Sequence, residues 1–128
     1  MSDIIYYGKC FFIREGVLYK YTGKETHIVI PNNVRRIEEK AFRFCNTIVS
    51  VEIPDSVTWI GWGAFSFCEN LERLVIPPTV SFISVSAIEG CRKLNTITIN
   101  NSEYYYVNDN KIYGKGKDAT IISIDIIK

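Results

Sequence analysis

The sequence predicts a right-handed, β-rich solenoid whose coils repeat every 23 residues. Two observations and one physical argument support this fold class. Three Ile-Pro pairs, at 30–31, 53–54 and 76–77, lie 23 residues apart. Further apolar columns keep the same spacing, and one such unit has a single apolar face that only stacking on a neighbour can bury. These columns are Val34/Val57/Val80, Ile37/Ile60/Ile83, Ala41/Ala64/Ala87, Ile48/Leu71/Leu94 and Val51/Leu74/Ile97.

Each repeat contains a strand, a corner and a turn. The segment 71–76 has the L-x-x-L-x-I spacing of leucine-rich repeats, which predicts a short strand with alternate side chains pointing inward. Pro77 ends backbone pairing after that strand. The segment 57–60 returns the chain to the core, and 64–68 has the spacing of a short helical or 3₁₀ turn. We therefore expect short strands on one side of the solenoid.

The complete pattern, I-P-x-x-V-x-x-I-x-x-x-A-F-x-x-C-x-x-L-x-x-x-x-I, closely resembles the BspA-type bacterial leucine-rich repeat family over roughly residues 25–100. The resemblance implies a leucine-rich-repeat solenoid with three full units and a partial fourth. Three departures, Ser84 for glycine, Ile88 for phenylalanine and Asn100 for proline, suggest degeneration toward the end of the array. Relatives with this repeat are often surface or secreted proteins that bind host or matrix components.

Aromatic-rich segments flank the repeats. Residues 12–19 parallel residues 106–113 at a spacing of 94, and the turn pairs Glu15-Gly16 and Asp109-Asn110 predict a β-hairpin in each. The strands after them, 28–30 and 122–124, are expected to join the stacked ladder. The prediction is one domain, 1–128, with an N-terminal hairpin cap (1–24), repeats (25–100) and a C-terminal hairpin cap (101–128). The alternative to capping is self-association through residues 4–7.

Composition excludes several functions. The formal net charge is +1, so the basic excess of a nucleic-acid or anionic-membrane binder is missing. The apolar stretches are too short to span a bilayer. The segment after Met1 does not look like a signal peptide, which predicts a cytoplasmic protein if Met1 is the native start. A fragment of a larger chain would instead fit the cell surface or secretion.

Three cysteines share one column of the repeat. Cys45, Cys68 and Cys91 are expected to stack roughly 5 Å apart, one per coil. Zinc ligands usually come in close pairs, so a structural ladder of buried thiols is the favoured interpretation, with a disulfide or a metal as the alternative. Cys10 lies outside the array, and its redox state is not predicted. We expect no metal and no cofactor.

No catalytic centre is predicted. His27, the only histidine, shares an outward-pointing column with Ser50, Arg73 and Thr96, and no triad motif accompanies it. Glu38 and Glu39 are adjacent, so their carboxylates diverge. The glycine-rich motifs that hold nucleotide phosphates do not occur. The chain is therefore predicted not to be an enzyme, and an enzyme without a sequence-visible site is a remote alternative.

The variable positions carry the candidate binding residues. Arg36, Trp59 and Phe82 form one column, and Trp62 flanks the inward Ile60, so at least one tryptophan should be partly exposed. Phe44 and Phe67 form another column, in which Gly90 shows that bulk is not required. The outward strand face, with His27 and Arg73, is a second candidate surface. The candidate binding surface therefore consists of Arg36, Trp59, Trp62, Phe82, His27 and Arg73.

The predicted function is a non-catalytic protein–protein interaction module with a protein partner, because exposed tryptophan marks interaction sites. The competing interpretation is that the rings pack over the turns and seal the flank of the solenoid. The alternative function is an architectural or self-assembling protein without a specific ligand. The chain is expected to be a monomer or a weak end-to-end homo-oligomer.

Overall fold

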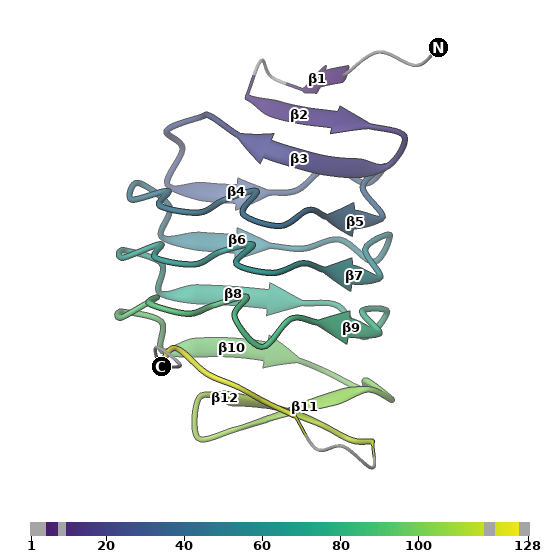
Figure 1. Ribbon diagram of the computed structural model, residues 1–128, viewed down its shortest axis with the longest axis vertical. Helices are drawn as coiled ribbons and strands as arrows, with labels where there is room; N and C mark the ends of the chain where they lie inside the picture. Colours follow the sequence, from purple (N-terminus) through teal and green to yellow (C-terminus); the bar gives the residue numbers. More distant parts are fainter. Residues whose placement is uncertain (1–4, 8–9, 117–119, 126–128) are drawn as a thin grey trace.

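The structure is a computed structural model that describes residues 5–7, 10–116 and 120–125. It is a β-solenoid of about four turns (Figure 1). Four parallel strands form a sheet that we call the first ladder, in the order β4, β6, β8, β10. They are β4 (His27–Val29), β6 (Ser50–Glu52), β8 (Arg73–Ile76) and β10 (Thr96–Ile99). The 23-residue repeat sets their register, since Val51 pairs with Ile28 and with Leu74.

A second parallel ladder lies on the other side of the coils. Its strands are β5 (Arg36–Ile37), β7 (Trp59–Ile60) and β9 (Phe82–Ile83). Short strands were expected on one side, where the first ladder has them, but this second set of strands was not expected. The corner segments turn the chain, and the repeat brings the corners of successive coils into register. Two residues of each corner then pair with two residues of the next as a short parallel strand.

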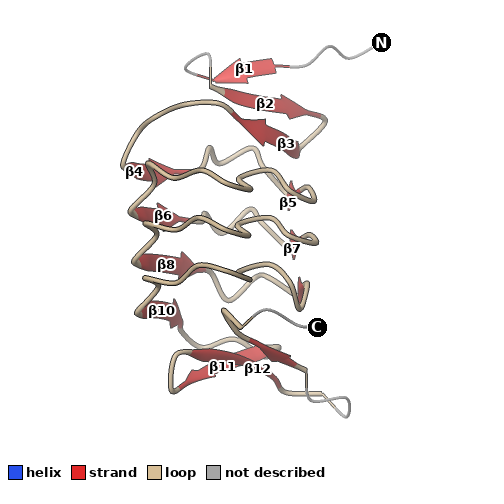
Figure 2. Cartoon of the chain, turned by 60° about the vertical axis from the view of Figure 1, so that its left-hand side comes forward, coloured by secondary structure: helices blue, strands red, loops and turns tan. Residues whose placement is uncertain are grey.

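The predicted helical or 3₁₀ turn was also wrong, since the described residues contain strands and loops but no helix (Figure 2). In its place lies a series of turns. Alternate amides bond within the coil, as Cys45 N–H does to the Phe42 carbonyl, and the amides between them bond to the next coil, as Phe44 N–H does to the Ser66 carbonyl. Positive φ angles of 60° at Lys40 and 61° at Phe44 prevent a helix, whose residues all have negative φ.

The core is built from the repeat columns. Their inward residues are buried in every coil, including Ile37, Ile60 and Ile83. A column of aromatic rings runs through the core: Tyr21 and Phe42 stack with centroids 5.4 Å apart, and Phe42 and Phe65 stack 5.0 Å apart. Apolar burial of this kind is the main term that stabilises the fold.

The N-terminal hairpin extends the second ladder. It consists of β2 (Phe11–Arg14) and β3 (Val17–Tyr21), and β1 (Ile5–Tyr7) pairs with β2. The predicted hairpin turn is confirmed, with positive φ at both Glu15 and Gly16. Strand β3 pairs in parallel with β5, so the hairpin takes the place of a preceding coil. Ile4 lies outside the described residues.

The C-terminal hairpin forms a separate antiparallel sheet of β11 (Tyr105–Asn108), β12 (Lys111–Gly114) and β13 (Ile121–Ile122). Its predicted turn at Asp109-Asn110 is confirmed. The expectation that 122–124 joins the first ladder was wrong, because Ile122 pairs antiparallel with Ile112. Both side chains are fully buried, so folding back on β12 gives this apolar segment a core of its own. The segment 28–30 met expectation: β4 covers 28–29, and Ile30 N–H bonds to the Glu52 carbonyl.

Candidate interaction surface

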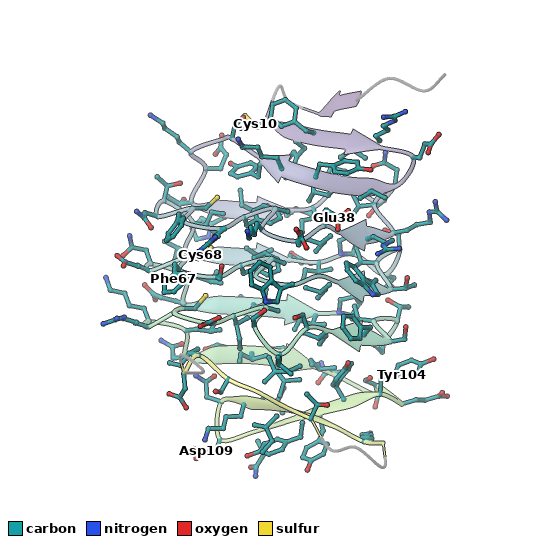
Figure 3. The ribbon with its side chains drawn as sticks, in the orientation of Figure 1. Cys10, Glu38, Phe67, Cys68, Tyr104 and Asp109 are labelled. Carbon is teal, nitrogen blue, oxygen red and sulfur yellow. The ribbon has the colours of Figure 1, made fainter. Side chains whose placement is uncertain are left out.

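The exposed aromatic residues of the repeats gather on one surface. We call it the front face and define it as residues 36–44, 59–67 and 82–90, which form the second ladder and the turns that follow it. It faces the viewer in Figure 3, where Glu38 lies near its middle and Phe67 at its edge. Four large apolar side chains are exposed here: Phe44 by 58%, Trp62 by 51%, Phe82 by 43% and Val85 by 42%.

The predicted column of Arg36, Trp59 and Phe82 is in contact along its length. The guanidinium carbon of Arg36 lies 4.0 Å from the Trp59 ring centroid, and Trp59 and Phe82 stack 5.4 Å apart. The Trp59 ring covers Gly61, where an added Cβ would lie only 2.6 Å from a ring carbon. Trp59 is therefore half-buried and helps to pack the corner of its coil.

Trp62 is the more accessible tryptophan, and its exposure confirms that at least one of the two faces solvent. Its ring has Lys40 Nζ 4.7 Å from the centroid. Cation–π contacts of this kind are worth about 0.5–1 kcal/mol at exposed sites. The Trp62 ring is thus held in place while half of it stays open to a partner.

Phe44 and Phe67 form a strained stack, in which Phe44 is exposed and Phe67 is half-buried. Their centroids lie 5.4 Å apart, and Arg43 lies over both rings, at 4.7 Å and 5.9 Å. Both residues have left-handed backbones, with φ of 61° and 57°, a region that bulky L-residues rarely adopt. The third coil has Gly90 at this position with φ of 78°. Glycine is therefore sufficient for the fold at this position. The repeat register predicted the column but not the left-handed backbone of its two phenylalanines.

A small hollow of about 30 Å³ lies between Trp62 and Phe67. Lys40, Arg43 and Glu89 also line it. Arg43 Nε is buried and has no hydrogen-bond acceptor among the described residues. A buried donor without an acceptor costs about 1–3 kcal/mol, so the hydrogen-bonding capacity of Arg43 is not fully used within the described residues.

His27 and Arg73 lie on the first ladder, away from the tryptophans, so the predicted set divides between two surfaces. His27 Nδ1 lies 2.6 Å from Ser50 Oγ, a contact that the shared column could have indicated. A triad also needs a carboxylate to orient the histidine, and none of the described carboxylates bonds to His27. A groove of about 530 Å³ runs beside these residues and includes Val29, Glu52 and Val75.

The cysteine column lies at the turn edge, where Cys68 is labelled in Figure 3. Cys68 Sγ donates to the Phe42 carbonyl at 3.1 Å, and Cys91 Sγ donates to the Phe65 carbonyl at 3.0 Å. All four cysteines are free thiols. The neighbouring Cys91 thiol and burial raise the pKa of Cys68, and burial raises the pKa of Cys45 to about 11. Cys45 and Cys68 are therefore protonated at neutral pH. Cys68 and Cys91 hold the turn as hydrogen-bond donors to carbonyls of the preceding coil.

The described residues hold neither a metal-binding cluster nor a membrane-spanning helix. No three histidine, cysteine, aspartate or glutamate side chains lie close enough together to hold a metal ion. No helix among these residues has the length and apolarity needed to cross a membrane.

Stacked 23-residue coils with a parallel ladder define a leucine-rich-repeat protein. The chain belongs to the family described as the BspA type leucine rich repeat region, whose pattern matches six copies over residues 13–125. The match extends beyond the repeats predicted at 25–100 and takes in most of both hairpins. No curated protein sequence matches the chain.

Three solved structures of bacterial leucine-rich-repeat proteins are similar to the chain. A leucine rich cell surface protein of Faecalibacterium prausnitzii is 29% identical, with a TM-score of 0.39 over 68% of this chain and 36% of that one. The Treponema pallidum (T. pallidum) leucine rich repeat protein is 20% identical, with a TM-score of 0.33 over 68% and 77%. A Eubacterium ventriosum protein is 18% identical, with a TM-score of 0.37 over 81% and 43%. The chain thus spans little more than a third of the first protein.

Proposed function

We propose that this chain is a non-catalytic protein-interaction module and that its front face binds the partner. The observation that carries the proposal is the strained Phe44–Phe67 stack, in which the Phe44 ring is exposed. A left-handed backbone costs a bulky L-residue about 1–2 kcal/mol, and strain of this kind concentrates at functional sites. Leucine-rich repeats commonly serve as interaction modules, which agrees with this assignment.

Burial does not account for the strain at Phe44. Full burial of a phenylalanine is worth about 1.5–3 kcal/mol, but Phe44 remains 58% exposed. The stack with Phe67 and the contact with Arg43 return part of that energy. Gly90 meets the same backbone requirement without strain, and the Phe67 ring packs over it. A role in recognition is therefore the reason that we propose for the exposed Phe44 ring.

The proposal includes the roles of the two ends. A right-handed coil with both hairpins as caps is consistent with the contacts at each end. Leu18 in β3 pairs with Ile37, and the Tyr105 hydroxyl accepts a hydrogen bond from Ile83 N–H. Ends that are covered in this way leave the sides of the solenoid, the front face among them, accessible to a partner. The cytoplasmic location and its cell-surface alternative stay predictions.

The test is capture by the immobilised chain from extracts of the producing cells and of their surroundings. We expect the wild-type chain to retain a defined partner, and Phe44→Gly and Trp62→Ser to lose it. Trp62→Ser is preferable to a change at Trp59, whose half-buried ring also packs on Gly61. Mass spectrometry identifies the retained proteins, and circular dichroism checks the fold of each variant.

Val29→Ser is the matched control. Val29 is 67% exposed on the first ladder, so the change removes an exposed apolar side chain of similar accessibility from the other surface. The proposal fails if the front-face variants retain the partner, or if Val29→Ser loses it while they keep it. Capture of further copies of this chain alone would favour the architectural alternative.

A further inference from the structure

We propose that the front face recognises an acidic segment, in which a carboxylate of the partner binds Lys40 and Arg43 beside an apolar side chain that packs on Trp62 and Phe67. This inference rests on the proposed function, because it assigns the chemistry of the partner at the same surface. It follows from the cations that lie on the rings of the front face, the hollow between those rings and the carboxylate that lines this hollow.

Cations of the first coil lie on aromatic rings of the second. Arg36 contacts Trp59, Lys40 contacts Trp62, and Arg43 contacts Phe67 as well as Phe44 in its own coil. None of these cations forms an ion pair within the described part of the chain. The rings therefore fix their positions while their charges remain available, and a preordered cation loses less entropy on binding.

The hollow provides a place for the carboxylate. It measures about 30 Å³, has Lys40 and Arg43 on its lining, and is bounded by the rings of Trp62 and Phe67. Arginine binds carboxylates through paired N–H donors, and such charge-assisted bonds are about twice as strong as neutral ones. Lys40 supplies a second cation from the same turn. A partner carboxylate that enters here would replace water at both cations. The backbone of the partner would then cross the exposed Trp62.

Glu89 limits this site and offers a test of it. Its side chain lines the same hollow and forms no ion pair with Lys40 or Arg43. The front face also carries Glu38 and Glu39, and Glu38 Oε1 accepts a hydrogen bond from Glu39 N–H. Of these three carboxylates, Glu89 is the one that lines the hollow itself, so removal of its charge should strengthen binding.

The experiment selects a random 12-residue peptide library on the wild-type chain, with counter-selection on Phe44→Gly. We expect the enriched peptides to contain Asp or Glu next to an aromatic or large aliphatic residue. The most enriched peptide and its Asn/Gln counterpart then serve as probes in fluorescence polarisation. The neutral peptide should bind about tenfold more weakly or worse, since hydrogen bonds between charged groups carry that much affinity.

The variants locate the carboxylate. Arg43→Gln should lower the affinity for the acidic peptide about tenfold and leave the affinity for the neutral peptide unchanged. Glu89→Gln should raise the affinity for the acidic peptide several-fold. Arg73→Gln, which removes the same charge from the first ladder, is the matched control and should change neither. Raising the salt concentration should weaken only the acidic peptide.

Three outcomes would overturn the inference: enrichment of neutral or basic peptides, no enrichment at all, or an equal effect of Arg43→Gln and Arg73→Gln. The first outcome, with binding still lost in Phe44→Gly, would leave the proposed function standing, because a partner would use the same surface with other chemistry. Failure of the capture experiment would instead remove the surface itself.

Discussion

Two phenylalanine stacks run along the solenoid, two residues apart in each coil. Phe42 and Phe65 stack 5.0 Å apart with both rings fully buried. Phe44 and Phe67 stack 5.4 Å apart, but Phe44 is 58% exposed and both backbones are left-handed. Residue type and ring geometry are nearly the same in the two stacks, so the difference between them lies in burial and in backbone strain.

This comparison separates what the fold requires from what it only permits. The buried stack excludes water, and replacing its rings would leave cavities that a close-packed core tolerates poorly. The exposed stack adds ring contacts at positions where the backbone favours glycine. The first column is explained by stability alone, and the second requires a further reason. The predictions below test that division.

The largest effect is expected for Phe65→Ala. Phe65 lies in the core beside Phe42, so the change should lower the free energy of unfolding by about 3–5 kcal/mol through lost burial and a cavity. Urea unfolding followed by circular dichroism measures it. The matched change Phe67→Ala, at the half-buried ring of the other stack, should cost clearly less. Equal losses in the two variants would show that both stacks are structural.

An intermediate effect is expected from the Cys45 thiol as pH rises. Burial raises its pKa from 9.0 to about 11, so the folded chain keeps a proton that the unfolded chain releases in this window. Stability from this group is complete below pH 9 and should fall between pH 9 and pH 11. Unfolding measured at pH 8 and pH 10.5 should show that loss.

Cys45→Ala provides the control for this pH effect. The variant should lose less stability than wild type across the same pH interval, because it has no thiol to ionise. In the native wild-type chain, alkylation of Cys45 should be slow at pH 8 and accelerate toward pH 11, since the thiolate is the reactive form. Identical pH profiles in the two chains would rule out a contribution from this thiol.

The sequence predicted what depends on the period of side chains. The inward columns, the first ladder and both hairpin turns follow from residue type and spacing, as with the positive φ at Asp109 and Asn110. The second ladder and the fold-back of Ile122 were not predicted, because they depend on hydrogen bonds between backbones that any residue can form. A 23-residue column shows which coils are stacked but not which amides pair.

The candidate surface was predicted only in part for a similar reason. The repeat register placed Arg36 beside Trp59, but Lys40 contacts Trp62 at an offset of 22 residues and was overlooked. The strain at Phe44 had one sequence signal, which is Gly90 in the same column. Glycine at one position of a column, with bulky residues at the others, can indicate a left-handed backbone that the whole column shares.

The smallest effect on stability is expected for Phe44→Gly, and this change tests the comparison most directly. Glycine removes the left-handed strain, which stabilises the folded chain. It also removes the stack on Phe67 and the contact with Arg43 and makes the unfolded chain less rigid, which destabilises the folded chain. These terms oppose one another, so the free energy of unfolding should change by only about 0.5 kcal/mol in either direction. Urea unfolding beside Phe42→Gly, which should be severely destabilised, gives the internal standard. A loss above about 2 kcal/mol at Phe44 would mean that the exposed ring holds the fold together and that its strain needs no partner to explain it.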